Sequence, residues 1–245
     1  MPTEVSDDLV LRPATPADAA AVAEVHLSAR ARAPMPAGIH SDDEVRTWLA
    51  SRLAVDEVWV VEVDGSVAAY ARMTDVWLDD LYVAPGHAGR GLGSALLELV
   101  KAQRPDGFSL WVFEMNRPAR AFYAARGLIE LERTDGEANE ERTPDIRMAW
   151  TGREPLAFLR RQIDEVDLTL GDLLARRAAL TRAVQPHKSD PSRDPVRERQ
   201  IAEAIAARVP ALGPDRVARV VDAIITESLA ALGPGGGADA APQHP

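Results

Sequence analysis

Cations stand where the apolar stripe of a long helix should continue. The apolar residues of segment 159–198 recur at steps of three and four: Leu159, Ile163, Val166, Leu170, Leu173, Leu180 and Val184. This spacing is typical of one face of a helix. The same steps reach Arg177 and Lys188, which an unbroken helix would point the same way, about 16 Å apart. Because a cation in a packed seam is costly unless it is paired, either the seam is not packed there or it surrounds an anion.

More ionic residues surround this stripe, and their combined spacing resembles the all-helical chorismate mutases. The resemblance covers about residues 156–232 and rests on Leu159-Arg-Arg-Gln-Ile-Asp-Glu-Val-Asp167, Leu173-Leu-Ala-Arg-Arg177, Lys188 and Arg193-Asp-Pro-Val-Arg-Glu198. It implies these roles: Arg160, Arg177, Arg197 and Ser228 bind substrate carboxylates, Lys188 faces the breaking ether oxygen, and Asp194 and Glu198 bind the ring hydroxyl. The family forms intertwined homodimers, so Arg160 would enter the partner's site.

This inventory of residues suits the rearrangement of chorismate to prephenate. Chorismate is a dicarboxylate, and its rearrangement needs no nucleophile and no proton transfer. Catalysis then consists of holding a compact conformer and stabilising charge on the ether oxygen with fixed donors. Arginine binds carboxylates through paired hydrogen bonds, and lysine suits a single oxygen.

Each of these residues also has a plainer interpretation. An isolated helical arginine such as Arg160 is most often a surface residue. Asp194 fits an N-cap, and both roles can hold at once. Ser228 fits a helix serine bonded to its own helix. Arg197 is harder to explain as a surface residue, because a cation in the first turn opposes the helix dipole.

Two positions depart from the family pattern. Pro186 predicts that the helix kinks or ends just before Lys188. Leu232 stands where the family commonly has a Gln or Glu donor for the ether oxygen, and losing one such donor can cost about 3 kcal/mol of transition-state stabilisation. The alternatives are a slow mutase, a mutase for an amino analogue of chorismate, an isochorismate pyruvate lyase, and a non-catalytic sensor of acetyl-CoA or chorismate.

A second candidate site is a glycine-rich turn between a strand that ends at Val83 and a helix that begins near Ser94. Gly89, Gly91 and Gly93 allow close approach to the backbone, and the first N–H groups of the helix face outward as an anion site. The turn lacks the Gly-Lys-Ser/Thr of a Walker motif, and it is a poor match to the dinucleotide-binding fingerprint.

The context of the turn resembles the GNAT superfamily of acetyl-CoA-dependent N-acetyltransferases. The resemblance covers most of residues 8–151 and rests on Leu81-Tyr-Val-Ala-Pro85, the turn, Leu110-Trp-Val-Phe-Glu-Met-Asn116, Ala119, Phe122-Tyr123 and Gly127. It implies a set of residues that bind acetyl-CoA: Val83, Gly89, Arg90, Gly91, Leu92, Gly93, Asn116 and Tyr123. The turn amides would hold the pyrophosphate and Asn116 the pantetheine arm, while Tyr123 would protonate the departing thiolate. Ala88 departs from the family's usual Gln or Arg.

Two aspartates are candidate bases for acetyl transfer. Asp79 and Asp80, on the strand before the turn, are placed to deprotonate an ammonium through water. The plainer interpretation is a solvated strand end, and for Tyr123 it is a packed aromatic ring with a bonded hydroxyl. The family places its acceptor pocket near residues 31–51, where nothing identifies the amine.

Composition limits the partners. The chain has 245 residues, no cysteine and a net charge of −10, all of which belongs to residues 1–151, because the remainder carries 13 basic and 13 acidic residues. An acidic first half argues against binding to nucleic acid or to anionic membranes. The absence of cysteine excludes disulfides and zinc–thiolate sites, and no metal is expected. The polar start and the lack of any long apolar run favour a cytoplasmic protein.

The order of elements predicts two domains and a tail. Strands are expected at 9–12, 57–63, 66–73, 77–83, 108–114, 128–133 and 145–150, with helices at 16–31, 42–53, 94–103 and 117–126. Residues 1–151 are therefore an α+β domain with a mixed sheet flanked by helices. Residues 152–232 are predicted to form an all-helical domain of three helices, which begin at Pro155, Pro195 and Pro214. The Gly/Pro-rich segment 233–245 is predicted to be a disordered tail.

Overall fold

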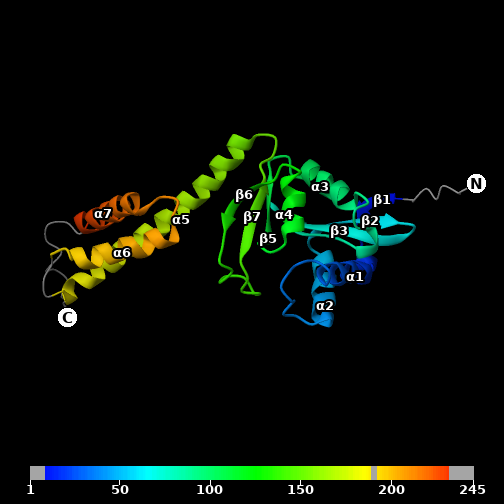
Figure 1. The fold of residues 1–245 in the computed structure, drawn as a ribbon, viewed down its shortest axis with the longest axis horizontal. Helices are drawn as coiled ribbons and strands as arrows, with labels where there is room; N and C mark the ends of the chain where they lie inside the picture. The colour runs from blue at the N-terminus through cyan, green and yellow to red at the C-terminus, as the bar shows by residue number, and fades with distance from the viewer. Residues whose placement is uncertain (1–8, 189–191, 232–245) are drawn as a thin grey trace, which may run out of the picture. The chain divides into compact units, whose positions relative to one another are not determined.

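The computed structural model describes residues 9–188 and 192–231, and the chain divides into the compact units Met1–Arg160 and Arg161–Pro245 (Figure 1). The predicted order of an α+β part followed by a helical part is confirmed. The predicted tail 233–245 and the position of Leu232 lie outside the described residues. Within the described residues, no helix is both long and apolar enough to cross a membrane.

The first unit is built on a seven-stranded sheet with the order β1-β2-β3-β4-β5-β7-β6. Its strands are β1 (Leu9–Pro13), β2 (Glu57–Val63), β3 (Ser66–Thr74), β4 (Trp77–Val83), β5 (Phe108–Phe113), β6 (Ile129–Arg133) and β7 (Asp145–Trp150). Its helices are α1 (Ala19–Arg30), α2 (Asp42–Leu53), α3 (Leu92–Gln103) and α4 (Arg117–Ala124). Short 3-10 turns lie at Pro16–Asp18 and Pro85–His87.

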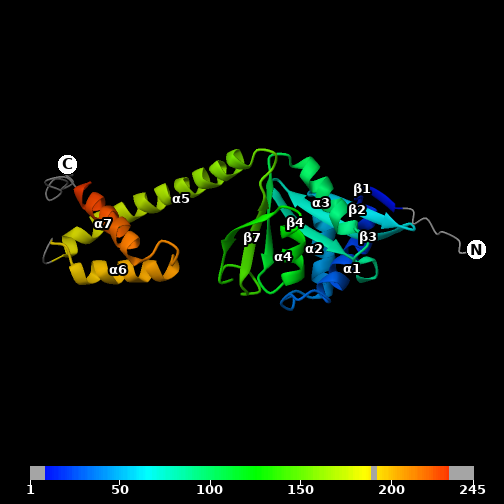
Figure 2. The ribbon, with the colours of Figure 1, turned by 45° about the horizontal axis from the view of Figure 1, so that its top comes forward.

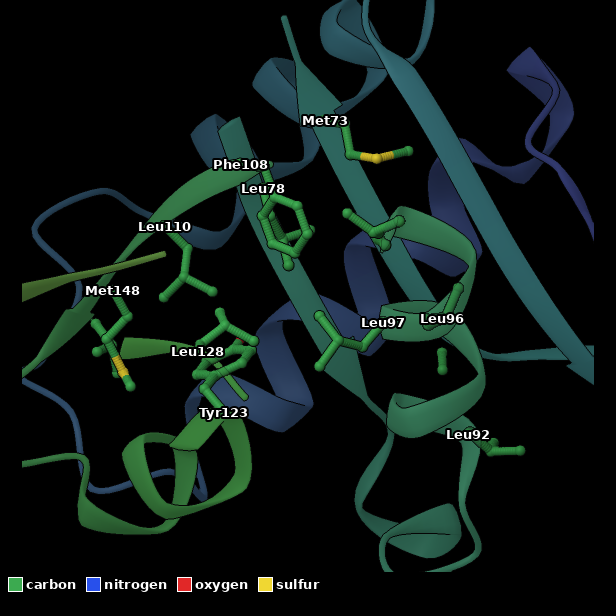
Figure 3. Packing of buried hydrophobic residues seen from close by; sticks show 14 of the residues in the cluster. Met73, Leu78, Leu92, Leu96, Leu97, Phe108, Leu110, Tyr123, Leu128 and Met148 are labelled. Carbon is green, nitrogen blue, oxygen red and sulfur yellow. The ribbon is translucent and has the colours of Figure 1, made fainter. Parts of the chain in front are cut away.

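Helices cover both faces of this sheet. α1 and α2 lie on one face and α3 on the other (Figure 1). Alternate residues of each strand point to opposite faces, so the sheet supplies both cores. Val60 and Tyr70 pack with α1, whereas Leu96 and Leu97 of α3 pack with Phe108 and its neighbours (Figure 3).

The sheet is interrupted in its middle. β4 and β5 are its one parallel pair of neighbours, and their register pairs only Trp77 with Ser109. The amide of Ser109 also donates to the carbonyl of Val76 at 2.9 Å. Beyond this point the described strands share no further pairs, so the second half of β4 presents unpaired backbone groups.

Among its described residues, the second unit is made of α-helices (Figure 2). α5 (Pro155–Val184) begins in the first unit and continues into the second, where α6 (Pro195–Arg208) and α7 (Pro214–Ala230) pack together. Val217, Val221 and Ile225 of α7 form the buried core of this pair. All three helices begin at the predicted prolines. The continuous helix to Lys188 is not formed, because α5 ends at Val184 and a 3-10 turn, Gln185–His187, contains Pro186.

Candidate active sites

The first candidate site is a large cleft in the first unit. It has a volume of about 1300 Å³ and lies where β4 and β5 diverge. Its walls are the second half of β4, β5, the start of α4, the connection from α1 to α2, and the loop before β7. The connection and the start of α2 supply lining residues between 31 and 48, which fall within the region 31–51 where the family resemblance places the acceptor pocket.

The glycine turn leads directly into α3. Gly89 and Gly91 have φ values of 78° and 88°, in the left-handed region that favours glycine. Gly91 is the N-cap residue, so Leu92 and Gly93 begin the helix just after it. A Cβ at Gly93 would lie 3.5 Å from both Phe122 and Val83, which is an ordinary packing distance.

The amides of this turn fit an anionic group. They belong to a helix N-terminus, where the first N–H groups have no partner within the helix and the dipole favours negative charge. The amide of Arg90 makes a long bond of 3.4 Å to the carbonyl of His87. Val83 is the last residue of β4 and lies just before the turn in the chain.

Asn116 and Tyr123 both line the cleft from α4. The Asn116 side chain caps this helix, since its oxygen accepts a hydrogen bond of 3.2 Å from the amide of Ala119. Its NH₂ group is the part left to serve a ligand. Tyr123 is 8% exposed, and burial raises the pKa of its hydroxyl, so the group stays protonated and able to donate.

The two candidate bases have different surroundings. Asp80 is buried, and its Oδ2 accepts a bond of 2.6 Å from Nε of Arg72. Arg72 also pairs with Asp56 at 2.8 Å and reaches Asp79 at 3.9 Å. The interpretation of Asp80 as a solvated strand end is therefore wrong. Burial raises the pKa of Asp79, and three carboxylates share one guanidinium beside the cleft.

A histidine–tyrosine pair that the sequence did not predict lies near Asp80. Nδ1 of His26 lies 2.7 Å from the hydroxyl of Tyr70, and His26 lines the cleft. Burial lowers the pKa of His26, so the ring is neutral at pH 7. Burial raises the pKa of Tyr70, and the nearby Asp80 carboxylate raises it further. His26 and Tyr70 are 44 residues apart, and each by itself reads as a core residue, so no local signal joins them.

The second candidate site lies in the second unit, around Arg177. Nη1 of Arg177 donates to Oγ of Ser228 at 2.8 Å and to the carbonyl of Ile224 at 3.4 Å. The structure thus brings together two predicted carboxylate-binding residues that are 51 positions apart. Ser228 also donates to the Ile224 carbonyl at 2.6 Å, so its plainer interpretation holds as well.

Lys188 follows the 3-10 turn in an extended conformation. Its ammonium group donates to the carbonyl of Ser192 at 3.2 Å. Pro186 therefore lies where the helix ends, as expected, and the ammonium of Lys188 is bound by the Ser192 carbonyl rather than continuing the stripe of α5.

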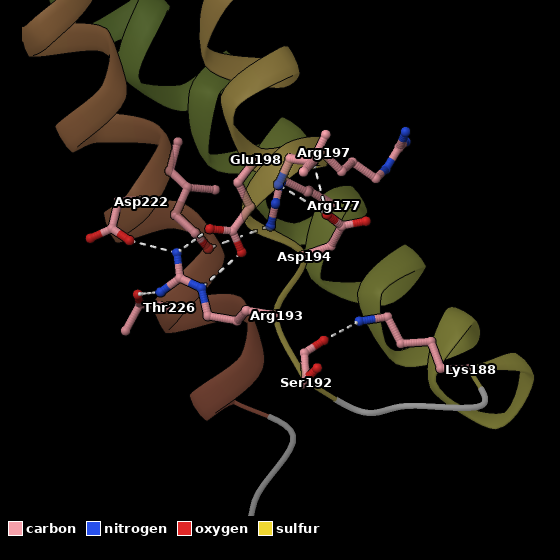
Figure 4. A network of polar contacts seen from close by, with 11 residues as sticks. Arg177, Lys188, Ser192, Arg193, Asp194, Arg197, Glu198, Asp222 and Thr226 are labelled. Carbon is pink, nitrogen blue, oxygen red and sulfur yellow. Dashed lines mark hydrogen bonds and ion pairs between the residues drawn. The ribbon is translucent and has the colours of Figure 1, made fainter.

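The start of α6 carries the remaining predicted residues (Figure 4). Asp194 is the N-cap, and its Oδ1 accepts from the amides of Val196 and Arg197, both at 3.0 Å. The side chain of Arg197 extends away from Glu198 in Figure 4. Both oxygens of Glu198 are instead bound by Arg193, at 2.8 and 2.7 Å.

Arg160 stands apart from this group. It is exposed, and it precedes Arg177 on α5 by seventeen residues, which correspond to a rise of about 25 Å. Figure 4 shows Arg177, Lys188, Asp194 and Glu198 in one region of the second unit, and Ser228 contacts Arg177 there.

Comparisons with known proteins match the two units separately. Residues 23–128 match the acetyltransferase (GNAT) family. Residues 159–231 match chorismate mutase type II. Both resemblances predicted from the sequence are confirmed.

Individual relatives match the first unit. The peptidyl-lysine N-acetyltransferase YiaC of Escherichia coli (strain K12) is 37% identical over 101 residues, which cover 40% of this chain and 66% of YiaC. The chain thus spans just under two thirds of this relative's length. The solution structure of apo-form YjaB from Escherichia coli has a TM-score of 0.50 at 18% identity, covering 59% of this chain and 98% of YjaB. The structure of yncA from Salmonella typhimurium with its cofactor acetyl-CoA has a TM-score of 0.47 at 23% identity, covering 59% of this chain and 94% of yncA.

Proposed function

We propose that this chain, which joins a GNAT acetyltransferase domain to a type II chorismate mutase domain, is a bifunctional enzyme. The helical part would rearrange chorismate to prephenate, and the first unit would transfer an acetyl group from acetyl-CoA to an amine. The observation that carries the first activity is the contact of Arg177 with Ser228, because it assembles two carboxylate-binding groups of the family from separate helices.

The mutase site would work by electrostatics alone. Arg177 and Ser228 would hold one carboxylate of chorismate, and Arg197 would bind a carboxylate as well. Glu198 would accept a hydrogen bond from the ring hydroxyl, with Asp194 beside it. Lys188 would meet the ether oxygen as negative charge develops on it. Fixed donors of this kind cost no reorganisation during the reaction.

A homodimer would complete this site. The apolar stripe of α5 is exposed within one chain: Ile163, Val166, Leu170, Leu173, Leu180 and Val184 are 46–65% exposed. A row of exposed apolar residues along one helix face marks an interaction surface. The family's intertwined dimer would bury this face against a second copy and bring Arg160 of each chain to the other's site.

The acetyltransferase site would use the cleft of the first unit. The turn amides of Gly89, Arg90, Gly91, Leu92 and Gly93 would bind the pyrophosphate. The unpaired edge of β4 and the amide of Asn116 suit the pantetheine arm, whose own amides need hydrogen-bond partners. Tyr123 would protonate the thiolate that leaves.

The acceptor would be a cationic primary amine. Six carboxylates line the cleft against the single arginine Arg30: Asp42, Asp79, Asp80, Glu140, Glu141 and Asp145. This excess of negative charge favours an ammonium. A lysine side chain of a peptide fits this requirement, and it is the acceptor in the name of YiaC.

The proton of that ammonium would pass to the group formed by His26, Tyr70 and Asp80. His26 is the neutral ring that reaches the cleft, Tyr70 fixes its orientation, and Asp80 supplies negative charge that favours the protonated ring. His26 would thus accept the proton, and Asp80 would stabilise the charge that forms on the ring.

Replacing Tyr70 with phenylalanine is expected to lower acetyl transfer by about tenfold. The change removes the hydroxyl bonded to His26 and leaves Nδ1 buried without its partner, which costs about 1–3 kcal/mol. The measurement is CoA release with a lysine-containing peptide, together with the thermal midpoint. Tyr82→Phe, which keeps the His26–Tyr70 bond, is expected to have a smaller effect, and equal losses in both variants would contradict this role.

The mutase activity has a direct test. Purified protein is incubated with chorismate, and prephenate formation is followed by its acid conversion to phenylpyruvate. Prephenate is the expected product. Unchanged chorismate, with no binding of an oxabicyclic dicarboxylate inhibitor, would overturn the mutase proposal, and supplying isochorismate and detecting salicylate would identify a lyase.

A further inference from the structure

Arg193 bonds three side chains in the second unit's candidate site, although the sequence assigned it no role. Its Nε and Nη2 bind the two oxygens of Glu198 at 2.8 and 2.7 Å. Its Nη2 also bonds Asp222 at 2.6 Å, and its Nη1 donates to Oγ1 of Thr226 at 3.1 Å. A single guanidinium therefore joins the connection before α6, the first turn of α6 and the middle of α7 (Figure 4).

This arrangement fixes the orientation of the Glu198 carboxylate and leaves some of its lone pairs free to accept further hydrogen bonds. An exposed glutamate populates several rotamers, whereas a bidentate pair with arginine holds the carboxylate plane in one orientation. An ionised carboxylate has about four lone-pair positions, and Arg193 uses two of them. The others remain available to a substrate hydroxyl.

The ionisation of Glu198 agrees with this geometry. Arg193 lowers the pKa of Glu198, while the nearby carboxylates of Asp222 and Asp194 oppose that effect. Glu198 is thus kept as an acceptor, which is the state that a donating hydroxyl requires.

We propose that Arg193 is a positioning residue of the chorismate site, which orients the Glu198 carboxylate toward the substrate hydroxyl and locks it to α7. This inference rests on the proposed mutase function. Because the hydroxyl does not react, its hydrogen bond is made equally in the ground state and in the transition state. Loss of such a bond raises KM and leaves kcat nearly unchanged.

A double-mutant cycle tests the inference in the full-length chain. Arg193→Met keeps most of the side-chain length and removes the guanidinium, and Glu198→Gln removes the charge of its partner. Coupling free energies between contacting residues correspond to changes of about 2- to 140-fold in an equilibrium constant. We therefore expect Arg193→Met to raise the KM for chorismate by about tenfold. The expected change in kcat is less than about threefold. In the Glu198→Gln background, the same substitution is expected to leave KM unchanged.

Arg219→Met is the matched control, because Arg219 is an exposed arginine of α7 outside this network. Its KM is expected to equal that of the wild type. If Arg193→Met does not fold, Arg193→Lys gives the same test, because lysine keeps the charge but cannot span both oxygens, and an intermediate KM is expected.

Two results would overturn the inference: an unchanged KM in Arg193→Met, or an equal rise of KM with and without Glu198. Wild-type protein that does not convert chorismate refutes the proposed function instead. In that case the cycle is repeated with the Kd of an oxabicyclic dicarboxylate, and wild-type protein that does not bind this inhibitor overturns both proposals.

Discussion

Replacing Lys188 with alanine is expected to lower the kcat for chorismate by about 10²–10³-fold, the usual cost of removing one donor from a site that stabilises developing negative charge. Charge appears on the ether oxygen only as its bond breaks, so the ammonium of Lys188 stabilises the transition state more than bound chorismate. The loss should therefore appear in kcat more than in KM. Steady-state kinetics of chorismate consumption provide the measurement.

The structure supplies the control for this experiment. Arg182, in the last turn of α5, is an exposed cation near the same helix end. Arg182→Ala changes the local charge by the same amount and is expected to leave turnover unchanged. Unchanged turnover in Lys188→Ala would contradict the role of Lys188 at the ether oxygen.

Local sequence signals predicted the elements well. The apolar alternation of residues 57–63 predicted the bounds of β2, and the capping box at Ser41 predicted the start of α2, each to within a residue or two. Both predictions succeed because strands and helix starts depend on neighbouring residues. Pro186 correctly predicted the end of α5 before Lys188. These features follow from chain stereochemistry within a few positions.

Non-local contacts could not be derived in the same way. The sequence left Asp80 as either a base or a solvated strand end, whereas the fold buries it against Arg72, whose guanidinium also pairs with Asp56. His26 and Tyr70 meet only because α1 packs on β3. Arg193 belongs to the motif that carried the family resemblance, yet its role depends on α7, which its own segment does not reveal.

The exposed apolar stripe of α5 leads to a second prediction, that charge placed in the stripe dissociates the homodimer and abolishes mutase activity. Leu170 and Leu180 are 46% and 59% exposed in one chain, and we expect a second copy to cover them. Substituting both with glutamate should place charge in that interface and dissociate the protein. Light scattering measures the mass of each form, and the monomeric variant is expected to lose nearly all mutase activity, because its sites lack the partner's Arg160.

Mixing two inactive variants separates a shared site from mere dimerisation. Arg160→Ala and Arg177→Ala each damage both sites of a homodimer. In a mixed dimer, however, one site receives both changes and the other receives neither, provided that Arg160 acts on the partner's site. Random exchange of equal amounts makes half of the dimers mixed, so about a quarter of wild-type activity should return. A mixture as inactive as its components would contradict the shared site and assign Arg160 to the site of its own chain. That result is not expected, because seventeen residues of α5 separate Arg160 from Arg177 by a rise of about 25 Å.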